Sequence, residues 1–342
     1  RRLNNKNSMA TLIHRPCPGI ISGNPLKFCA SASCVNFEEK VEDTINFIID
    51  VSKKVDPSLP WELGFSGGKD STVVLSLLIE AMGRGARIPK LYVIYADTLL
   101  EHPVLRRETL DALESLKQIP NIVPVRLVPR EDFITMMVER GYPAPGPRFR
   151  WCMARLKLRP MQEFMSKLGR YVQVSGVRAS ESNDRIRRYG ELIKFVNFNN
   201  PLVMPILDWT VNDVFTYLRT KKRWDGKDFN YLLDLYEVKE CDVLIANVRF
   251  GCWVCTVVSN DKMPTPQILK WARQKLLEIS RDPRMREFDE SGRPRKLNEL
   301  GRREVARVFL EVSEKYPEAL GYDINELKDK LRKIIYGDFT AS

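Results

Sequence analysis

The stretch SGGKDST at residues 66–72 constrains this chain most, because it lies between two strongly apolar segments. The residues from Trp61 can form a short buried strand, and residues 73–79 have the pattern of an apolar helix. A turn between a strand and a helix directs free backbone N–H groups to one point, and the helix dipole adds positive potential there. Gly67 and Gly68 permit positive φ and close approach of a ligand to the backbone. The stretch therefore predicts a binding site for a phosphate chain.

Strand and helix patterns alternate from a helix expected at 37–55 to about residue 220. The run KLYVIYADT from Lys90 is continuously apolar, which is typical of a buried parallel strand, and a helix is expected around 103–117. IVPVRLVP and YVQVSGVRASES add two further strands. This alternation predicts an α/β fold with a doubly wound, mostly parallel sheet.

Ligands of such sheets bind at the carboxyl ends of the strands. Three polar sites are expected at these ends, namely Ser66, Asp97 and residues 176–178. They are far apart in the sequence, but the fold can bring them together in one crevice.

Changes in composition divide the chain into four parts. Residues 1–36 are an irregular segment with cysteines, residues 37–235 are the α/β domain, residues 236–263 are a cysteine-rich insert, and residues 264–342 are a helical region. Three amphipathic helices are expected in the helical region.

Length, composition and charge limit the class of protein. The chain has 342 residues, 44% of them hydrophobic, which suffices for one large domain with an appendage or for two domains. No apolar run approaches the roughly 20 residues of a membrane span, and the N-terminus has no signal-peptide pattern. A soluble cytoplasmic protein without a membrane partner is therefore expected. The net charge of +11 favours a polyanionic partner.

The chain has seven cysteines but only two histidines, so a histidine-rich metal site is excluded. Cytoplasmic thiols stay reduced, which favours metal binding or redox chemistry over disulfides. Cys252 and Cys255 can bind one metal centre through a tight turn. With Cys152 and Cys241 they make a set that suits a [4Fe–4S] cluster or a structural zinc. The alternative is that Cys152 and Cys241 are small buried apolar residues. The sequence assigns no firm role to the three N-terminal cysteines, Cys17, Cys29 and Cys34.

The pattern S-G-G-x-D-S at residues 66–71 resembles the PP-loop of the ATP pyrophosphatase superfamily. The resemblance implies an adenine nucleotide α-hydrolase-like fold, cleavage of ATP between its α and β phosphates, and activation of a substrate oxygen as an adenylate. It implies that Lys69 adds positive charge and that Asp70 holds Mg²⁺. The groups that would donate hydrogen bonds to the leaving pyrophosphate belong to Ser66, Gly67, Gly68, Ser71 and Thr72.

Three further motifs resemble the adenylylsulfate reductase branch of this superfamily. They are YADTLLEHP from Tyr95, GVRASESNDR from Gly176 and MPILDWTVNDVFTYL from Met204. With them, Asp97 and Gly176 are expected to line the nucleotide site. In that branch the arginines of the second motif face anionic groups, which makes Arg178 and Arg185 candidate anion contacts. The alternative for both arginines is a solvated surface.

The pattern RWC…LK…P, followed by C…RFGCWVCTVV…DK, resembles the DndC and SspD family of DNA phosphorothioation proteins over residues 60–263. The resemblance implies a [4Fe–4S] cluster, ATP hydrolysis to AMP and pyrophosphate, and replacement of a non-bridging oxygen of the DNA backbone by sulfur. Cys241, Cys252 and Cys255 are then the firmest cluster ligands, with Cys152 as the fourth. The implied partners are DNA and other phosphorothioation proteins, including a cysteine desulfurase.

Two other functions remain open from the sequence. One is a PP-loop tRNA thiolase or another sulfonucleotide-type sulfurtransferase, and the other is a non-catalytic nucleic-acid-binding module stapled by zinc. DNA docking is expected on the basic run at residues 281–307, for which the alternative is a solvated helix–loop surface. The basic residues singled out there are Arg293, Arg295, Lys296, Arg302 and Arg303.

Overall fold

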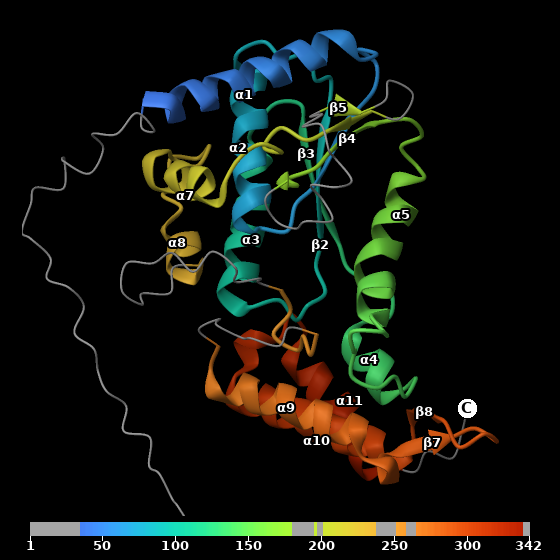
Figure 1. Cartoon of the computed structure of the whole chain (residues 1–342). Helices are drawn as coiled ribbons and strands as arrows, with labels where there is room; N and C mark the ends of the chain where they lie inside the picture. The colour runs from blue at the N-terminus through green and yellow to red at the C-terminus, as the bar shows by residue number, and fades with distance from the viewer. Residues whose placement is uncertain (1–34, 180–194, 197–200, 237–250, 258–264, 338–342) are drawn as a thin grey trace, which may run out of the picture.

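A computed structural model describes residues 35–179, 195–196, 201–236, 251–257 and 265–337 (Figure 1). Its main feature is a six-stranded sheet with the order β3-β2-β1-β4-β6-β5. β5 pairs antiparallel with β6 at one edge, and every other pair is parallel. The strands are β1 (Trp61–Gly64), β2 (Leu91–Ala96), β3 (Ile122–Leu127), β4 (Val172–Val174), β5 (Phe195–Val196) and β6 (Leu202–Val203).

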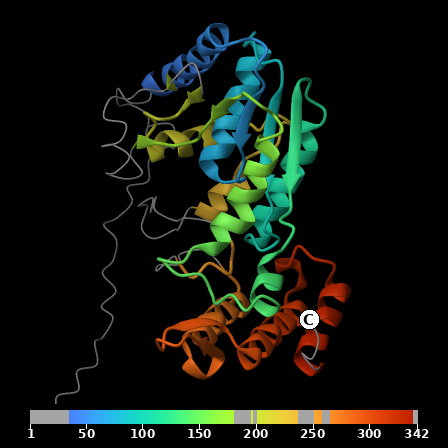
Figure 2. The same ribbon diagram turned by 90° about the vertical axis from the view of Figure 1, so that its right-hand side faces the viewer.

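Helices cover both faces of the sheet, which confirms the expected doubly wound α/β fold. α2 and α3 lie on one side, and α5 lies on the other, where Figure 2 shows it in front of the strands. The helices up to the insert are α1 (Val35–Lys54), α2 (Lys69–Gly83), α3 (Pro103–Leu116), α4 (Phe133–Val138), the π-helical turn η2 (Met153–Leu158), α5 (Arg159–Met165), α7 (Val211–Thr220) and α8 (Asn230–Tyr236).

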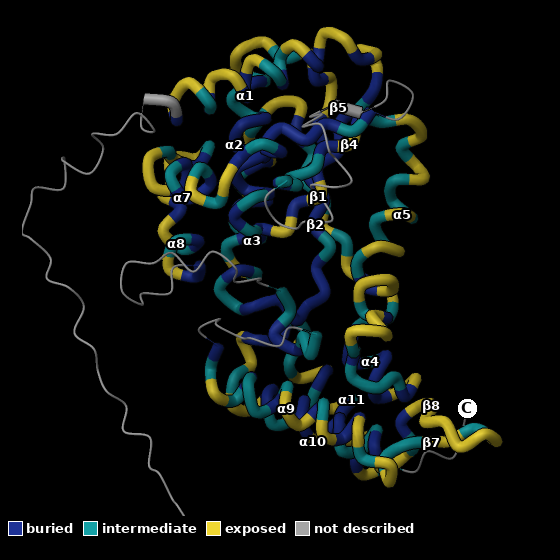
Figure 3. The backbone as a smooth tube through the Cα atoms, in the orientation of Figure 1, coloured by how far each residue is buried: buried dark blue, intermediate teal, exposed yellow. Residues whose placement is uncertain are grey.

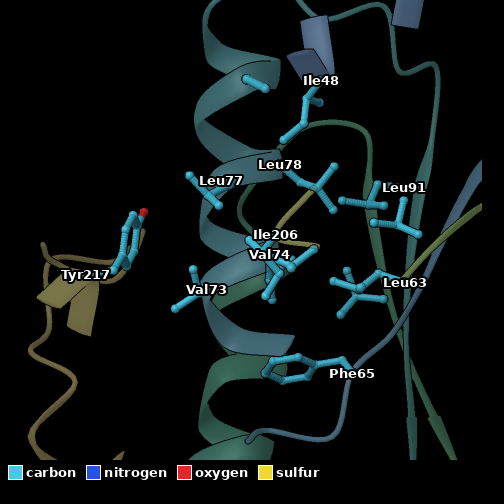
Figure 4. Packing of buried hydrophobic residues seen from close by; sticks show 14 of the residues in the cluster. Ile48, Leu63, Phe65, Val73, Val74, Leu77, Leu78, Leu91, Ile206 and Tyr217 are labelled. Carbon is cyan, nitrogen blue, oxygen red and sulfur yellow. The ribbon is translucent and has the colours of Figure 1, made fainter. Parts of the chain in front are cut away.

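α2 is the central helix of the larger core, because most of its positions carry apolar side chains. In Figure 4, Leu78 faces Leu91 of the sheet, while Val73 and Leu77 lie on the side of Tyr217 from α7. Burying each such side chain contributes about 1.5–3 kcal/mol. The loop in front of α2 is therefore attached to one of the best-anchored elements of the fold.

A second core joins α4 to the helical C-terminal region, which lies below the carboxyl ends of β1 and β2 in Figure 1. The three expected amphipathic helices are present, and two short 3₁₀ turns connect them to their neighbours. In the described part of the chain, no helix has the length and apolar character needed to cross a membrane. The elements are α9 (Gln267–Arg281), η4 (Pro283–Met285), β7 (Arg286–Phe288), β8 (Pro294–Leu297), α10 (Glu299–Lys315), η5 (Pro317–Ala319) and α11 (Ile324–Tyr336).

The hairpin β7–β8 is a feature that the sequence reading missed, since the charged run from residue 281 was read as helix and loop. Pro294 cannot continue a helix, and Gly292 adopts a φ of 73°, so the chain turns here. The Asp289 carboxylate closes the turn by accepting hydrogen bonds from the backbone N–H groups of Ser291 and Arg293, at 3.1 and 2.9 Å.

Candidate functional site

The loop between β1 and α2 has the geometry of an anion site. Gly67 has a φ of 70°, and a Cβ added there would lie 1.8 Å from the Thr109 hydroxyl oxygen, so only glycine fits. Gly68 precedes the first turn of α2, and no side chain of the described residues caps that end of the helix. The Ser66 and Ser71 hydroxyls lie 3.1 Å apart beside the backbone N–H groups of the first turn of α2, and the Gly68 N–H donates to the Ser66 hydroxyl at 3.4 Å. Backbone and hydroxyl donors therefore converge at a helix N-terminus, which suits a phosphate.

Asp70 lies between two cations. Its carboxylate accepts a hydrogen bond of 2.6 Å from the Lys69 ammonium and one of 2.7 Å from Arg178 Nε. Gly176 packs directly on the loop, because a Cβ there would contact the Asp70 carbonyl carbon at 3.4 Å and the Ser71 nitrogen at 3.5 Å. The loop after β4 thus brings Gly176 and Arg178 to the end of β1, where the strand-end argument expects them. Arg185 lies outside the described residues.

α8 closes the other side of the loop. The ammonium of Lys69 lies 5.1 Å from the ring centroid of Tyr236, a distance typical of a cation–π contact. The Tyr236 hydroxyl would lie 3.1 Å from a Cβ at Gly68. Lys69 is buried between the tyrosine ring and Asp70, and Thr72 is buried in the first turn of α2. The sequence did not point to Tyr236 because the contact joins residues far apart in the chain.

Asp97, which the sequence placed with the nucleotide, is held by arginines of its own chain at the end of β2. Arg106 donates two hydrogen bonds to it, of 3.0 and 2.9 Å, and Arg126 donates one of 2.8 Å. The Leu99 backbone N–H adds another of 2.9 Å. Burial alone would raise the pKa of Asp97, but the hydrogen bonds and charge of Arg106 outweigh it and lower the pKa. Asp97 therefore remains an anion that orders the loop after β2.

The loop after β2 contacts the cysteine segment at residues 251–257. The Trp253 backbone N–H donates to the Leu100 carbonyl at 2.9 Å, and the His102 N–H donates to the Gly251 carbonyl at 3.3 Å. The Trp253 indole N–H donates to the Ala319 carbonyl at 2.9 Å. Residues 251–257 are thus fixed between the end of β2 and the C-terminal helical region.

Cys252 lies in a polar cluster at this junction. Its sulfur is 3.1 Å from the Thr98 hydroxyl and 3.8 Å from the Glu101 carboxylate. The Cys255 N–H donates to the Cys252 carbonyl at 3.0 Å, which forms the tight turn expected of C-x-x-C. Burial raises the pKa of Cys252 to about 12, and Lys157 opposes the shift. Without a bound metal this thiol therefore stays protonated at neutral pH.

The described cysteines are all free and lie in one region. Burial, followed by the nearby Cys255, raises the pKa of Cys152. The described residues alone form no group of three His, Cys, Asp or Glu side chains arranged for a metal ion. Thiols are nevertheless the donor type that iron–sulfur clusters and structural zinc use, and metal binding would deprotonate them. Cys241, Cys17, Cys29 and Cys34 lie outside the described residues.

A cavity of about 230 Å³ joins the loop to the cysteine segment. The Lys157 ammonium lies 3.4 Å from the Glu101 carboxylate in its wall. The pKa of Lys157 is raised, first by Cys252 in its thiolate form and then by Glu101, with which it pairs, so this side chain is cationic at neutral pH. The cavity is smaller than the roughly 300–1,000 Å³ of typical ligand pockets, so a whole nucleotide would extend beyond it. Its lining includes Ser66, Gly68, Ala96, Glu101, Lys157 and Gly251.

Sequence reasoning missed Glu101 and Lys157, although both lie inside motifs that it used. Glu101 belongs to YADTLLEHP, and Lys157 is the lysine of RWC…LK…P. Nothing in the sequence except these motifs indicates a role for the two residues. The fold is needed to place both beside Cys252.

One protein family and two curated proteins match this chain in sequence. The family model of the phosphoadenosine phosphosulfate reductase domain matches residues 61–257. An uncharacterised protein of Methanocaldococcus jannaschii is 31% identical over 228 residues, which cover 65% of this chain and 41% of the relative. A second one from the same organism is 29% identical over 199 residues, covering 57% and 41%. This chain thus spans about two fifths of the length of these curated relatives.

Solved structures with similarity to this chain include three enzymes. The phosphoadenylyl-sulfate reductase from Candida auris in complex with phosphate is 14% identical, covers 66% of this chain and 100% of its own, and has a TM-score of 0.37. The Candida glabrata FMN adenylyltransferase with FAD and pyrophosphate is 15% identical, with coverages of 80% and 81% and a TM-score of 0.39. The U34-tRNA thiolase NcsA from Methanococcus maripaludis with its [4Fe–4S] cluster is 13% identical, with coverages of 88% and 80% and a TM-score of 0.33.

Proposed function

The chain belongs to the phosphoadenosine phosphosulfate reductase domain family, and on this premise we propose that it is an ATP pyrophosphatase that activates a substrate for sulfur transfer. The observation that carries the proposal is the cavity between the loop at 66–68 and the cysteine segment. A nucleotide held at the loop would place its α-phosphate near the sulfur ligands. Activation and sulfur delivery would then occur in one space.

The loop at residues 66–72 binds the β- and γ-phosphates of ATP, which leave as pyrophosphate. The free N–H groups at the start of α2 and the hydroxyls of Ser66 and Ser71 donate hydrogen bonds to the pyrophosphate. Lys69 and Arg178, which flank Asp70 when the site is free of nucleotide, supply positive charge to the phosphates. Asp70 is the residue that would hold Mg²⁺, which would neutralise charge on the phosphate oxygens.

The chemistry proceeds in two displacements at phosphorus. A substrate phosphate oxygen attacks the α-phosphorus of ATP, the α–β bridging P–O bond breaks, and pyrophosphate leaves. A sulfide nucleophile then attacks the substrate phosphorus, and the activated oxygen leaves as part of AMP. Lys157 faces this space as a cation and suits the developing anion.

Cys152, Cys252 and Cys255, with Cys241, are the residues that would hold a [4Fe–4S] cluster. When bound, such a cluster would supply either electrons or a site for sulfide. The position of Gly251 in the cavity wall supports this, because it brings the C-x-x-C turn to the edge of the nucleotide space.

The substrate that we propose is the DNA backbone phosphate, which becomes a phosphorothioate. The motifs over residues 60–263 and the net charge of +11 support a polyanionic substrate of this kind. The sulfur would come from a partner protein, namely a cysteine desulfurase, as the outer sulfur of its persulfide, which a thiol reductant supplying two electrons would release as sulfide. Modification of tRNA in place of DNA in a thiolation assay would contradict the choice of substrate and leave the ATP chemistry intact.

Pyrophosphate release from ATP by the purified protein tests the proposal. In the absence of substrate, water attacks the α-phosphorus in place of the substrate oxygen, so the wild-type chain is expected to form AMP and pyrophosphate in equal amounts, and Asp70→Ala is expected to abolish both. Asp50→Ala is the matched control, because that carboxylate lies exposed on α1 and, among the described residues, pairs with the neighbouring Lys53. Unchanged pyrophosphate release by Asp70→Ala would mean that the loop at residues 66–72 does not take part in ATP cleavage.

A further inference from the structure

A second cavity, of about 630 Å³, lies away from the nucleotide site, between residues 142–149 and the hairpin β7–β8. We call it the hairpin groove. The hairpin is held in place there because the Leu297 N–H donates a hydrogen bond of 2.7 Å to the Gly141 carbonyl. Figure 3 shows the hairpin as an exposed projection beside the C-terminal helices. Residues that line the groove include Tyr142, Phe149, Phe288, Arg295 and Lys296.

Aromatic rings are unusually accessible in the hairpin groove. Phe149 is 50% exposed and Phe288 is 49% exposed. The rings of Tyr142 and Phe149 are nearly parallel, with 5° between their planes and 6.2 Å between their centroids. Exposed rings of this kind are costly in water unless a partner covers them, and flat faces suit the stacking of unpaired bases.

The segments that carry these rings are rich in cations, of which Arg295 and Lys296 line the groove itself. Arg148 and Arg150 flank Phe149 in the chain, and Arg293 and Lys296 belong to the hairpin region; all four are exposed and form no ion pair within the described ranges. The Arg155 guanidinium lies 5.5 Å from the Tyr142 ring centroid. This arrangement of exposed cations around exposed rings matches a surface that binds phosphates and stacks bases.

Two acidic residues also line the groove, namely Glu287 and Asp289. The Asp289 carboxylate interacts within the hairpin, because it accepts a hydrogen bond from the Ser291 N–H in the turn and lies 3.9 Å from Arg295 Nε. The lining itself thus holds two carboxylates and two cations, while the two segments that form it, residues 142–150 and 286–296, carry six Arg and Lys side chains against three Asp and Glu side chains.

We propose that the hairpin groove docks a single-stranded segment of DNA, with its bases on Phe149 and Phe288 and its phosphates at the surrounding cations. The choice of DNA rests on the proposed function. Base stacking needs unpaired bases, so the bound segment is single-stranded at this point. The helix η2 connects the two sites, since Arg155 covers Tyr142 while Lys157 lines the nucleotide cavity.

Fluorescence anisotropy with a labelled single-stranded oligonucleotide and the full chain tests the proposal. Phe149→Ala and Phe288→Ala are each expected to weaken binding at least five-fold, the size expected for the loss of one stacked base. Tyr336→Ala is the control, because this tyrosine is 79% exposed on α11 and lies outside the groove, so its removal should leave affinity unchanged. Lys296→Ala is expected to reduce the salt dependence of binding by roughly 0.7 in logarithmic slope.

Pyrophosphate release in the absence of DNA separates this proposal from the proposed function. The groove variants should keep wild-type release, since none of the altered side chains contacts the loop. Unchanged affinity in both phenylalanine variants would overturn the groove, even if ATP is cleaved. A loss of affinity in Lys296→Ala alone would also overturn it, because binding would then be electrostatic without stacking. Preference for RNA of the same sequence would overturn the choice of DNA.

Discussion

Glu62 offers a sharp test of the physical account, because it is a buried carboxyl group in the middle of the sheet. It lies on β1, between Tyr92 of β2 and Gln173 of β4 in the strand register. The side chain is 1% exposed, and its two oxygens have no hydrogen-bond partner among the residues that the structure describes. Burial therefore raises the pKa of Glu62 from 4.5 to about 7.

This shift makes stability depend on pH in a predictable direction. Below pH 4.5 the carboxyl is protonated in the folded and unfolded chains, and its burial carries no ionic penalty. As the pH rises from 4.5 to about 7, the unfolded chain loses the proton first and the folded chain is progressively destabilised. The full penalty above pH 7 is about 3 kcal/mol, from the size of the shift.

The assay is denaturant unfolding of the wild type and Glu62→Gln across this pH range. The amide cannot ionise, so the free energy of unfolding of the wild type relative to the variant should fall by about 3 kcal/mol between pH 4.5 and pH 8. If the amide changes the free energy of unfolding by an amount that does not depend on pH, that amount cancels when the two pH values are compared. Glu62 makes no contact with the loop, so pyrophosphate release should persist in Glu62→Gln. A difference that does not change with pH would refute the reasoning.

Two further predictions concern the elements that hold the site. Gly67→Ala should destabilise the loop and weaken ATP binding more than Gly85→Ala. Both positions have positive φ, but of the two only Gly67 lacks space for a Cβ. Equal thermal unfolding temperatures and equal ATP affinities in the two variants would contradict this. Asp97→Asn should cost about 3–5 kcal/mol, since it breaks a buried ion pair with Arg106. Arg126→Ala should cost about 1 kcal/mol or less, because that side chain is 43% exposed; denaturant unfolding of both variants checks the order.

The sequence allowed the order of strands and helices to be predicted, because apolar periodicity and glycine placement are local signals. The helix expected at 103–117 is α3 (Pro103–Leu116), and the loop before α2 lies where the glycines indicated. The tight turn at Cys252 was likewise visible from residue spacing.

Long-range contacts could not be predicted in the same way. The expectation that Asp97 lines the nucleotide site stays a prediction, but its partners Arg106 and Arg126 could not be expected, because they are brought to it only by the pairing of β2 with β3 and by the packing of α3. The role of Lys157 depends on its approach to Glu101 across the cavity. The hairpin β7–β8 was missed because alternating charges gave no apolar period to read.

The central claim is that one space holds both the ATP loop and a sulfur-bearing cysteine centre. Its most direct test is the iron and acid-labile sulfide content of the full chain, purified without oxygen. The account predicts about four irons and about four sulfides per chain. One tightly held zinc without iron would contradict it, because the cysteines would then form a structural site with neither electrons nor a position for sulfide to supply to the cavity.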